Sequence, residues 1–206
     1  MTTLKRTLDL AARRAVAARA EVVLRDTGAV RAAHVALADG RHATEAIDAA
    51  RLLADPVATG ELCGYLAAPH RHEDGSPAVD VVVGPPGPGA VLAFETARRL
   101  RVRAAPGDAA SGALVAESRA LLVDLELAHD GGLLAAIPHI EAAGAELVGC
   151  AVVLDRTDGR AQVTSAVTWA SYPFAALWRP DLATFVPGPE TCPACAKGVA
   201  LDAGHA

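Results

Sequence analysis

The hydrophobic and polar positions of this chain first follow a helical period and then an alternating one. Residues 4–25 carry apolar side chains at helical spacing, which predicts an amphipathic helix that covers a sheet or a partner. In residues 34–48 an Asp39-Gly40 turn lies between short alternating runs, which indicates a β-hairpin. Asp55-Pro56 then opens a second helix, expected to end near Ala68.

Further along the chain, buried apolar runs alternate with helical patterns. Strands are expected at 79–83, 101–105, 120–124 and 146–155, and helices at about 89–100 and 131–143. Strands that alternate with helices form parallel sheets with right-handed crossovers. The pattern therefore predicts an α/β fold, with a Rossmann-like central parallel sheet flanked by helices and a small N-terminal hood of helix and hairpin. Ligands of such sheets bind at the carboxyl ends of the strands.

Length and charge set the broad class. We expect 206 residues to form a single domain, with hood elements in 1–56, an α/β core in 57–180 and a C-terminal tail in 181–206. The net charge of −5 argues against a nucleic-acid-binding face, which needs a basic stripe. Because we find neither a charge-free span of membrane length nor a signal-peptide pattern, the chain is expected to be a soluble, cytoplasmic protein without membrane contact.

The stretch with the clearest chemistry is 120–137, ALLVDLELAHDGGLLAAI. An apolar strand pattern ends at Asp124, and a helical pattern resumes at Leu133. The loop between them, residues 128–132, lies at the carboxyl edge of a strand and the amino end of a helix. Unpaired N–H groups and the helix dipole attract anions there. The loop is either a phosphate-binding site or a plain turn, and the surrounding sequence is needed to distinguish the two.

This stretch resembles the ribose-phosphate motif of type I phosphoribosyltransferases, in which two adjacent acids hold the ribose hydroxyls and a Thr-Thr-Gly-Gly loop wraps the 5′-phosphate. The resemblance extends over nearly the whole chain and is closest to the orotate phosphoribosyltransferase group. The segments that fall in that group's order are 26–30, 34–56, 79–104, 140–156 and 185–201. It implies the type I phosphoribosyltransferase fold, a nucleotide or phosphoribosyl ligand, Mg²⁺ in an active enzyme, and a homodimer.

The motif departs from the family where the chemistry is done. Asp124 keeps the first acid and is the catalytic candidate, whereas Leu125 replaces the second. Ala128 and His129 stand where the two hydroxyl residues belong. The resemblance assigns phosphate binding to the last four loop residues, His129, Asp130, Gly131 and Gly132.

Two residues of this loop also have simpler roles. Asp130 is placed to cap the following helix, and its carboxylate would then repel a phosphate. His129 either donates to a phosphate or stays neutral at the helix start.

Cationic residues are missing where the family uses them. The only two lysines are Lys5 and Lys197, although the family has lysines near positions 48–50 of the hairpin and in a mobile basic loop. That loop is shortened here to residues 104–118, and it contains neither lysine nor arginine. A preference for arginine over lysine in the genome would explain the lysine count, but it does not explain a loop that lacks both.

A second candidate loop is Gly84-Pro85-Pro86-Gly87-Pro88-Gly89, which matches the family's pyrophosphate loop. The resemblance assigns ligand binding to Gly84, Pro85, Gly87 and Gly89. Because each proline lacks an N–H, the loop has lost three donors. It is therefore either an impaired binding loop or a rigid structural turn.

Histidine and cysteine complete the list of candidates. His42 matches a Gly-Arg/Lys-His segment of the family, which leaves a ligand-facing role open. Cys63 and Cys150 lie in apolar runs and are expected to act as small hydrophobic residues. Cys192 and Cys195 form a CxxC pair, which is half of a tetrahedral zinc site, with His205 as a third ligand at loose spacing. The alternative, a reduced turn-forming motif, is favoured by the sequence.

Two functions remain. The first is a divergent phosphoribosyltransferase that acts on a pyrimidine-like or other heteroaromatic acceptor. The second is a homologue that is impaired for the orotate reaction and serves in nucleotide-related binding or regulation. Transfer needs a stabilised pyrophosphate leaving group, so the missing donors favour the second.

Overall fold

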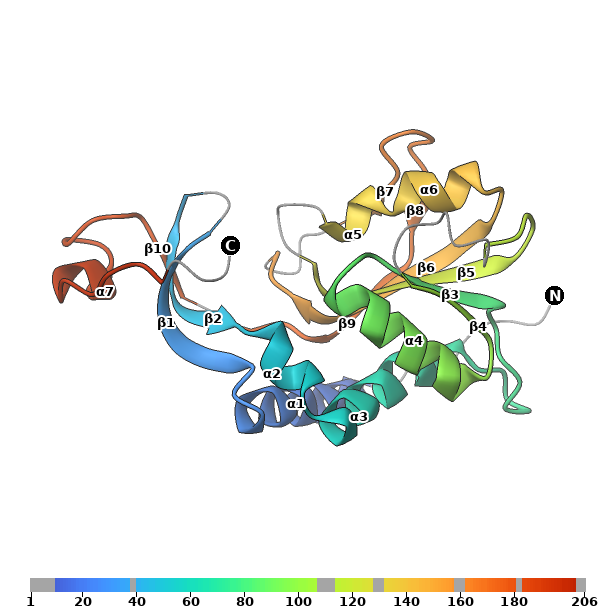
Figure 1. Ribbon diagram of the computed structural model, residues 1–206, viewed down its shortest axis with the longest axis horizontal. Coiled ribbons are helices and arrows are strands. Elements are labelled where there is room, and N and C mark those ends of the chain that lie inside the picture. Colours follow the sequence, from blue (N-terminus) through green and yellow to red (C-terminus); the bar gives the residue numbers. More distant parts are fainter. Residues whose placement is uncertain are drawn as a thin grey trace.

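The computed structural model describes residues 10–37, 40–106, 114–127, 132–157, 162–180 and 183–202. Its centre is a five-stranded sheet with strand order β4-β3-β5-β6-β9, in which every neighbouring pair is parallel (Figure 1). The strands are β3 (Val81–Gly84), β4 (Arg103–Pro106), β5 (Arg119–Leu127), β6 (Glu146–Asp155) and β9 (Phe174–Trp178). The α/β class and the central parallel sheet are confirmed.

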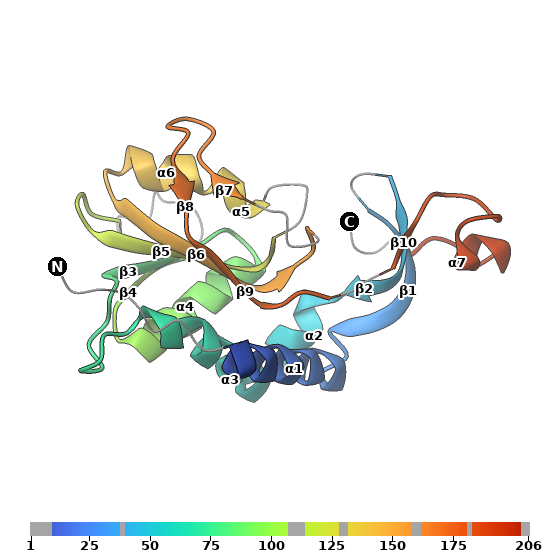
Figure 2. The ribbon, with the colours of Figure 1, turned by 180° about the vertical axis from the view of Figure 1, so that it is seen from behind.

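Helices cover both faces of this sheet (Figures 1 and 2). One side carries α1 (Leu10–Asp26), α3 (Pro56–Ala67), the 3₁₀ turn Ala68–His70 and α4 (Pro88–Leu100), and the other carries α5 (Gly132–Ala135) and α6 (Ile137–Ala142). Side chains of a strand alternate between faces, so Leu121 and Val123 join the apolar cluster with α3 and α4, whereas Leu122 joins the cluster with α5 and α6.

Local chemistry explains the helix boundaries. Asp55 caps α3, since its carboxylate accepts from the N–H groups of Val57 at 2.9 Å and Ala58 at 3.0 Å, and Pro56 fits the first helical position. The expected helix over 131–143 is two short helices instead. Pro138 lies at the start of α6, where its missing N–H costs nothing, and the chain is interrupted at Ala136.

The hairpin of the hood belongs to a three-stranded antiparallel sheet with strand order β1-β2-β10, and this sheet is called the hood from here on. The predicted hairpin is formed by β1 (Val30–Ala36) and β2 (His42–Ile47), and the short helix α2 (Ala49–Leu53) follows it. The third strand, β10 (Thr184–Phe185), comes from the C-terminal tail, which also forms α7 (Pro193–Ala196) beside the hairpin (Figure 2). The tail therefore returns to the N-terminal part of the fold.

The segment between β6 and β10 was not assigned any element from the sequence. It contains a small two-stranded sheet of β7 (Val163–Thr164) and β8 (Ser171–Tyr172), and then the core strand β9. Among the helices that the structure describes, none has the length and hydrophobicity to cross a bilayer.

Candidate functional site

The carboxyl ends of β3 and β5 bring two sequence candidates together. Val83 pairs with Leu122 in parallel register, so the loop after β3 lies beside Asp124. A Cβ atom placed on Gly89 would lie 2.8 Å from Oδ1 of Asp124 and 2.7 Å from Cδ of Pro85. Glycine at position 89 is therefore what allows the acid and the loop to approach each other so closely.

The Gly84–Gly89 loop is tightly folded. A Cβ atom on Gly84 would lie 2.1 Å from the carbonyl oxygen of Gly89, and Gly87 has φ of +88°, which favours glycine. Gly87 caps α4 without a side-chain hydrogen bond, and its own carbonyl accepts from the N–H of Ala90 at 3.2 Å. With proline at 85, 86 and 88, the loop can offer a ligand only the N–H groups of its glycines.

Leu125, at the position of the family's second acid, faces the apolar core. It is 5% exposed and belongs to the same cluster as Val123. Beyond the predicted strand end, β5 continues its ladder with β6, where Glu126 pairs with Leu154 and Leu127 with Asp155. Leu125 therefore lies on the same face of the sheet as Leu121 and Val123, the face covered by α3 and α4.

Charged residues at this edge are engaged with one another. Asp155 is 1% exposed, and its carboxylate accepts from Nε of Arg179 at 2.7 Å and from the N–H of Thr157 at 2.9 Å. Burial raises the pKa of Asp155, but these hydrogen bonds outweigh burial and the pKa is lowered. Arg156 donates to Glu126 at 3.2 Å. These two arginines are therefore already paired with acids of the protein.

The loop with the ribose-phosphate resemblance is described only at its end. His129, Asp130 and Gly131 lie outside the described residues, and so does His205. Gly132 begins α5, and a Cβ atom there would meet nothing within 4 Å.

The stretch 48–50, near which the resemblance implies a lysine, begins with a helix cap. Asp48 is the N-cap of α2, and its carboxylate accepts from the N–H of Arg51 at 3.3 Å and from Nε of Arg51 at 3.2 Å. Asp48 therefore stabilises the start of α2.

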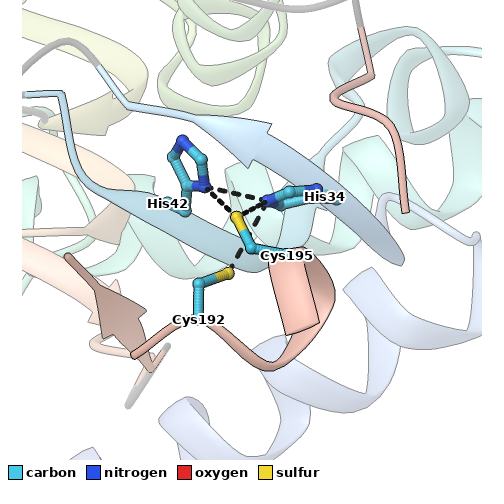
Figure 3. Close-up of side chains that lie close together, drawn as sticks. All are labelled: His34, His42, Cys192 and Cys195. Atoms are coloured by element: carbon cyan, nitrogen blue, oxygen red, sulfur yellow. Dashed lines mark hydrogen bonds between the residues drawn. The ribbon is translucent and has the colours of Figure 1, made fainter. Parts of the chain in front are cut away.

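A second cluster of chemistry-bearing side chains lies in the hood (Figure 3). His34 comes from β1, His42 from β2, and Cys192 and Cys195 come from α7 and the residue before it. Nε2 of His34 lies 2.9 Å from Nδ1 of His42 and 3.6 Å from the sulfur atoms of Cys192 and Cys195. The Cys195 sulfur lies 3.3 Å from Nδ1 of His42. His42 thus turns toward the two cysteines.

This cluster is enclosed. His34, His42 and Cys192 are buried, and Cys195 is partly exposed. Burial raises the pKa of the Cys192 thiol, but the backbone N–H groups of Cys195 and Ala194 outweigh burial and the pKa is lowered. The sequence proposed Cys192 and Cys195 as metal ligands with His205 as the third, gave His42 a ligand-facing role through the family resemblance, and assigned no role to His34. The signal that could have found it was a second histidine on the same hairpin, which completes a two-cysteine, two-histidine set.

The other two cysteines behave as expected from the sequence. Cys63 and Cys150 are buried in the two apolar clusters of the core. Burial raises the pKa of Cys63 to about 11 and that of Cys150 to about 12, which keeps both thiols protonated.

Comparison with solved structures defines the class of the fold. UMP synthase from Leishmania donovani matches with a TM-score of 0.63 and 21% identity, over 78% of this chain and 36% of that one. Orotate phosphoribosyltransferase from Aeropyrum pernix matches with a TM-score of 0.60 and 19% identity, over 78% of this chain and 93% of that one. The fold is that of the type I phosphoribosyltransferases.

Sequence relatives narrow the class to a family. Orotate phosphoribosyltransferase from Thermus thermophilus is 33% identical over 192 residues, which cover 86% of this chain and 95% of the relative. The enzyme of the same name from Heliobacterium modesticaldum is 31% identical over 184 residues, covering 85% of this chain and 91% of the relative. No model of a known protein family matches the chain. The chain belongs to the orotate phosphoribosyltransferase family.

Proposed function

We propose that this family member is impaired in transferring phosphoribose to orotate and acts in pyrimidine metabolism as a nucleotide-related binding or regulatory homologue. The observation that carries the proposal is Leu125, which occupies the position of the second acid and is 5% exposed within the core. A cytoplasmic location, expected from the sequence, is part of the same proposal.

The physical argument concerns charge at the transition state. Pyrophosphate must leave with its negative charge stabilised, and the ribose must be held while positive charge develops on it. The 104–118 loop has no cationic residue, Asp48 caps a helix, and three N–H donors are absent from the Gly84–Gly89 loop. Loss of one preorganised donor commonly costs about 2.7–4 kcal/mol, or roughly 100- to 1000-fold in rate. Several such losses together would remove most of the catalysis.

The alternative is a divergent active transferase with a pyrimidine-like or other heteroaromatic acceptor, and one observation favours it. Asp124 is retained and lies against the Gly84–Gly89 loop, where an acid could orient ribose hydroxyls. Mg²⁺ often binds through one or two carboxylates together with substrate phosphates. Asp124 fits that minimum, although the neighbouring Leu125 contributes no ligand.

Calorimetry on the full chain separates these functions. Phosphoribosyl pyrophosphate with Mg²⁺, orotate and nucleoside monophosphates are titrated in turn. The proposal expects no micromolar binding of the pyrophosphate donor and no useful synthesis of orotidine monophosphate. Micromolar binding of the donor, or turnover in the typical range of about 1–1000 per second, would establish the active alternative.

A matched variant guards against contaminating enzyme. Asp124→Asn keeps the size of the side chain and removes the charge. Residual turnover that persists unchanged in this variant comes from the host, whereas turnover that disappears with it belongs to this chain. Expression in a strain without its own orotate phosphoribosyltransferase provides the same check independently.

We also propose a homodimer, as the family resemblance implies. Exposed apolar side chains support it, since Val22 of α1 is 44% exposed, Val57 of α3 is 81% exposed and Phe94 of α4 is 59% exposed. Light scattering should therefore give about twice the chain mass of 21.0 kDa. A monodisperse species with the mass of one chain would contradict this part of the proposal.

A further inference from the structure

The buried histidine and cysteine cluster of the hood has no role in the chemistry of the sheet edge. It joins a hairpin near the start of the chain to the C-terminal tail, and its four candidate ligand atoms all lie within 4.8 Å of one another (Figure 3). We propose that His34, His42, Cys192 and Cys195 bind one Zn²⁺ in a closed structural site that fastens the tail to the hood.

Four of the six separations between the ligand atoms are close to those around a tetrahedral ion, and the other two are at most 4.8 Å. With Zn–S bonds of about 2.3 Å and Zn–N bonds of about 2.0 Å, a tetrahedron spaces its ligand atoms by roughly 3.3–3.8 Å. The two sulfur atoms lie 3.6 Å from Nε2 of His34, and Cys195 lies 3.3 Å from Nδ1 of His42. The two histidine nitrogens, 2.9 Å apart, need to separate by only a few tenths of an ångström.

The surroundings of His34 prepare it as a ligand. Its Nδ1 lies 2.7 Å from the carbonyl oxygen of Val199. Because a carbonyl only accepts, Nδ1 carries the proton, and the lone pair of Nε2 faces the cluster. Zinc-bound histidines usually donate their second N–H to such an oxygen, which fixes both tautomer and ring orientation. The partner here belongs to the tail itself.

The ligand set indicates the metal and the kind of site. Two thiolates with two imidazoles are typical of structural zinc, and four protein ligands leave no open position for substrate or water. Binding releases the two thiol protons to solvent, and the two thiolate charges then balance the charge of Zn²⁺. The site therefore stabilises structure and takes no part in transfer.

Beyond β10, which pairs with β2, the described end of the tail has few other anchors. α7 has only four residues and no buried side chain of its own, and Val199 and Leu201 are 49% and 47% exposed. An isolated helix of this length is not stable in water. The remaining anchors include the N–H of Asp202, which donates to the His34 carbonyl at 2.7 Å, and the pair of Arg31 with Asp202 at 2.7 Å. A metal bound by both parts supplies the missing stabilisation.

Metal analysis of the full chain, purified under reducing conditions without a metal-affinity tag, is the first test. Elemental mass spectrometry for a panel of metals should find one Zn²⁺ bound per chain. Cys195→Ser and His34→Gln should each weaken zinc binding by more than the roughly 10- to 100-fold typical of losing an outer partner. Cys63→Ala and His139→Gln, which remove a cysteine and a histidine elsewhere, should keep the full zinc content.

A cobalt titration tests the same site without relying on variants that fold. Co²⁺ added to metal-free wild-type protein should give the intense visible bands of a tetrahedral complex and a thiolate charge-transfer band, and Zn²⁺ should displace it. An octahedral spectrum, or no thiolate band, would overturn the proposal. Zinc that survives in His34→Gln and in Cys195→Ser would overturn it too, as would metal-free reduced protein that binds no Zn²⁺ when titrated with it.

Limited trypsin digestion tests the role in fastening the tail. Lys197 follows α7 directly, so a released tail offers trypsin a cleavage site there. A zinc chelator should accelerate cleavage after Lys197 at least about tenfold in the wild type, and added Zn²⁺ should reverse it, as expected when metal binding is coupled to local folding. In Cys195→Ser, cleavage should be fast with or without the chelator. Chelator-independent cleavage in the zinc-loaded wild type would contradict the structural role.

Discussion

The carboxylate of Asp124 lies against the backbone of Gly89, so that a Cβ atom at position 89 would be 2.8 Å from Oδ1. This contact joins the second half of β5 to the start of α4. It means that the acid retained from the family and the loop matched to its pyrophosphate site form one unit. A substitution in the Gly84–Gly89 loop is therefore expected to displace the carboxylate of Asp124.

The first prediction concerns Gly89→Ala. The added methyl group would collide with Pro85 and Asp124, so we expect a loss of about 1–3 kcal/mol in the free energy of unfolding, as for overpacked sites. Urea denaturation measures it. Gly132→Ala is the matched control, because a Cβ atom there meets nothing within 4 Å. It should be neutral or stabilising by up to about 1 kcal/mol. Equal losses in both variants would contradict the close contact.

The second prediction is that restoring the family's acid with Leu125→Asp does not restore transfer. The side chain lies in the apolar cluster with Val123, so the variant loses about 2 kcal/mol or more from the missing leucine, with the cost of burying a carboxyl added. Denaturation at pH 7 compares it with Leu125→Met, which conserves volume and should cost less than about 1.5 kcal/mol. A stable Leu125→Asp protein that gains orotidine monophosphate synthesis would show this prediction wrong.

Local chemistry made part of the fold predictable. Asp55-Pro56 predicted the start of α3, because helix capping by Asp55 and the restricted φ of Pro56 depend only on neighbouring residues. The core strand β9 was not predicted, because Phe174–Trp178 is a short apolar run without a helical or alternating period. Its position in the sheet is set by pairing with β6, which the sequence alone does not show. Pro138 was passed over inside an apolar helical pattern, although it begins a second helix.

The two candidate sites also differ in how far the sequence could predict them. Asp124 and the Gly84–Gly89 loop were predictable because strand order places them at one edge. The cluster in the hood joins His34 to Cys192 across 158 positions of sequence. No local sequence pattern spans that separation. The two residues come together only because the tail adds β10 to the hairpin. The orientation of Leu125 was also hidden, since it depends on how far the β5 ladder continues.

The third prediction contrasts two arginines that pair with acids. Arg179 donates to the buried Asp155, so Arg179→Ala leaves that carboxylate short of a partner and should cost about 1–3 kcal/mol. Arg156 pairs with the more accessible Glu126, and Arg156→Ala should cost less than about 1 kcal/mol. Thermal and urea unfolding of both variants test the difference. A cost for Arg156→Ala equal to or above that for Arg179→Ala would overturn it.

The last prediction concerns acid. The ring of His70 is partly buried, and this burial lowers its pKa from 6.5 to about 4. The folded state therefore resists protonation, whereas the unfolded state takes up a proton below pH 6.5. His70 therefore favours the folded state fully above pH 6.5, and this contribution to the free energy of unfolding is lost as pH falls toward 4. Between pH 8 and pH 5 the loss amounts to about 2 kcal/mol.

The variant that tests it is His70→Gln, which removes the titrating ring. Its free energy of unfolding should fall less than that of the wild type between pH 8 and pH 5, so the two curves should converge toward acid. His139→Gln, at an exposed histidine of α6, should follow the wild-type curve throughout. Because other groups titrate in all three proteins, the difference between variants carries the result. Parallel curves for wild type and His70→Gln over this range would show that burial of His70 does not couple the fold to pH.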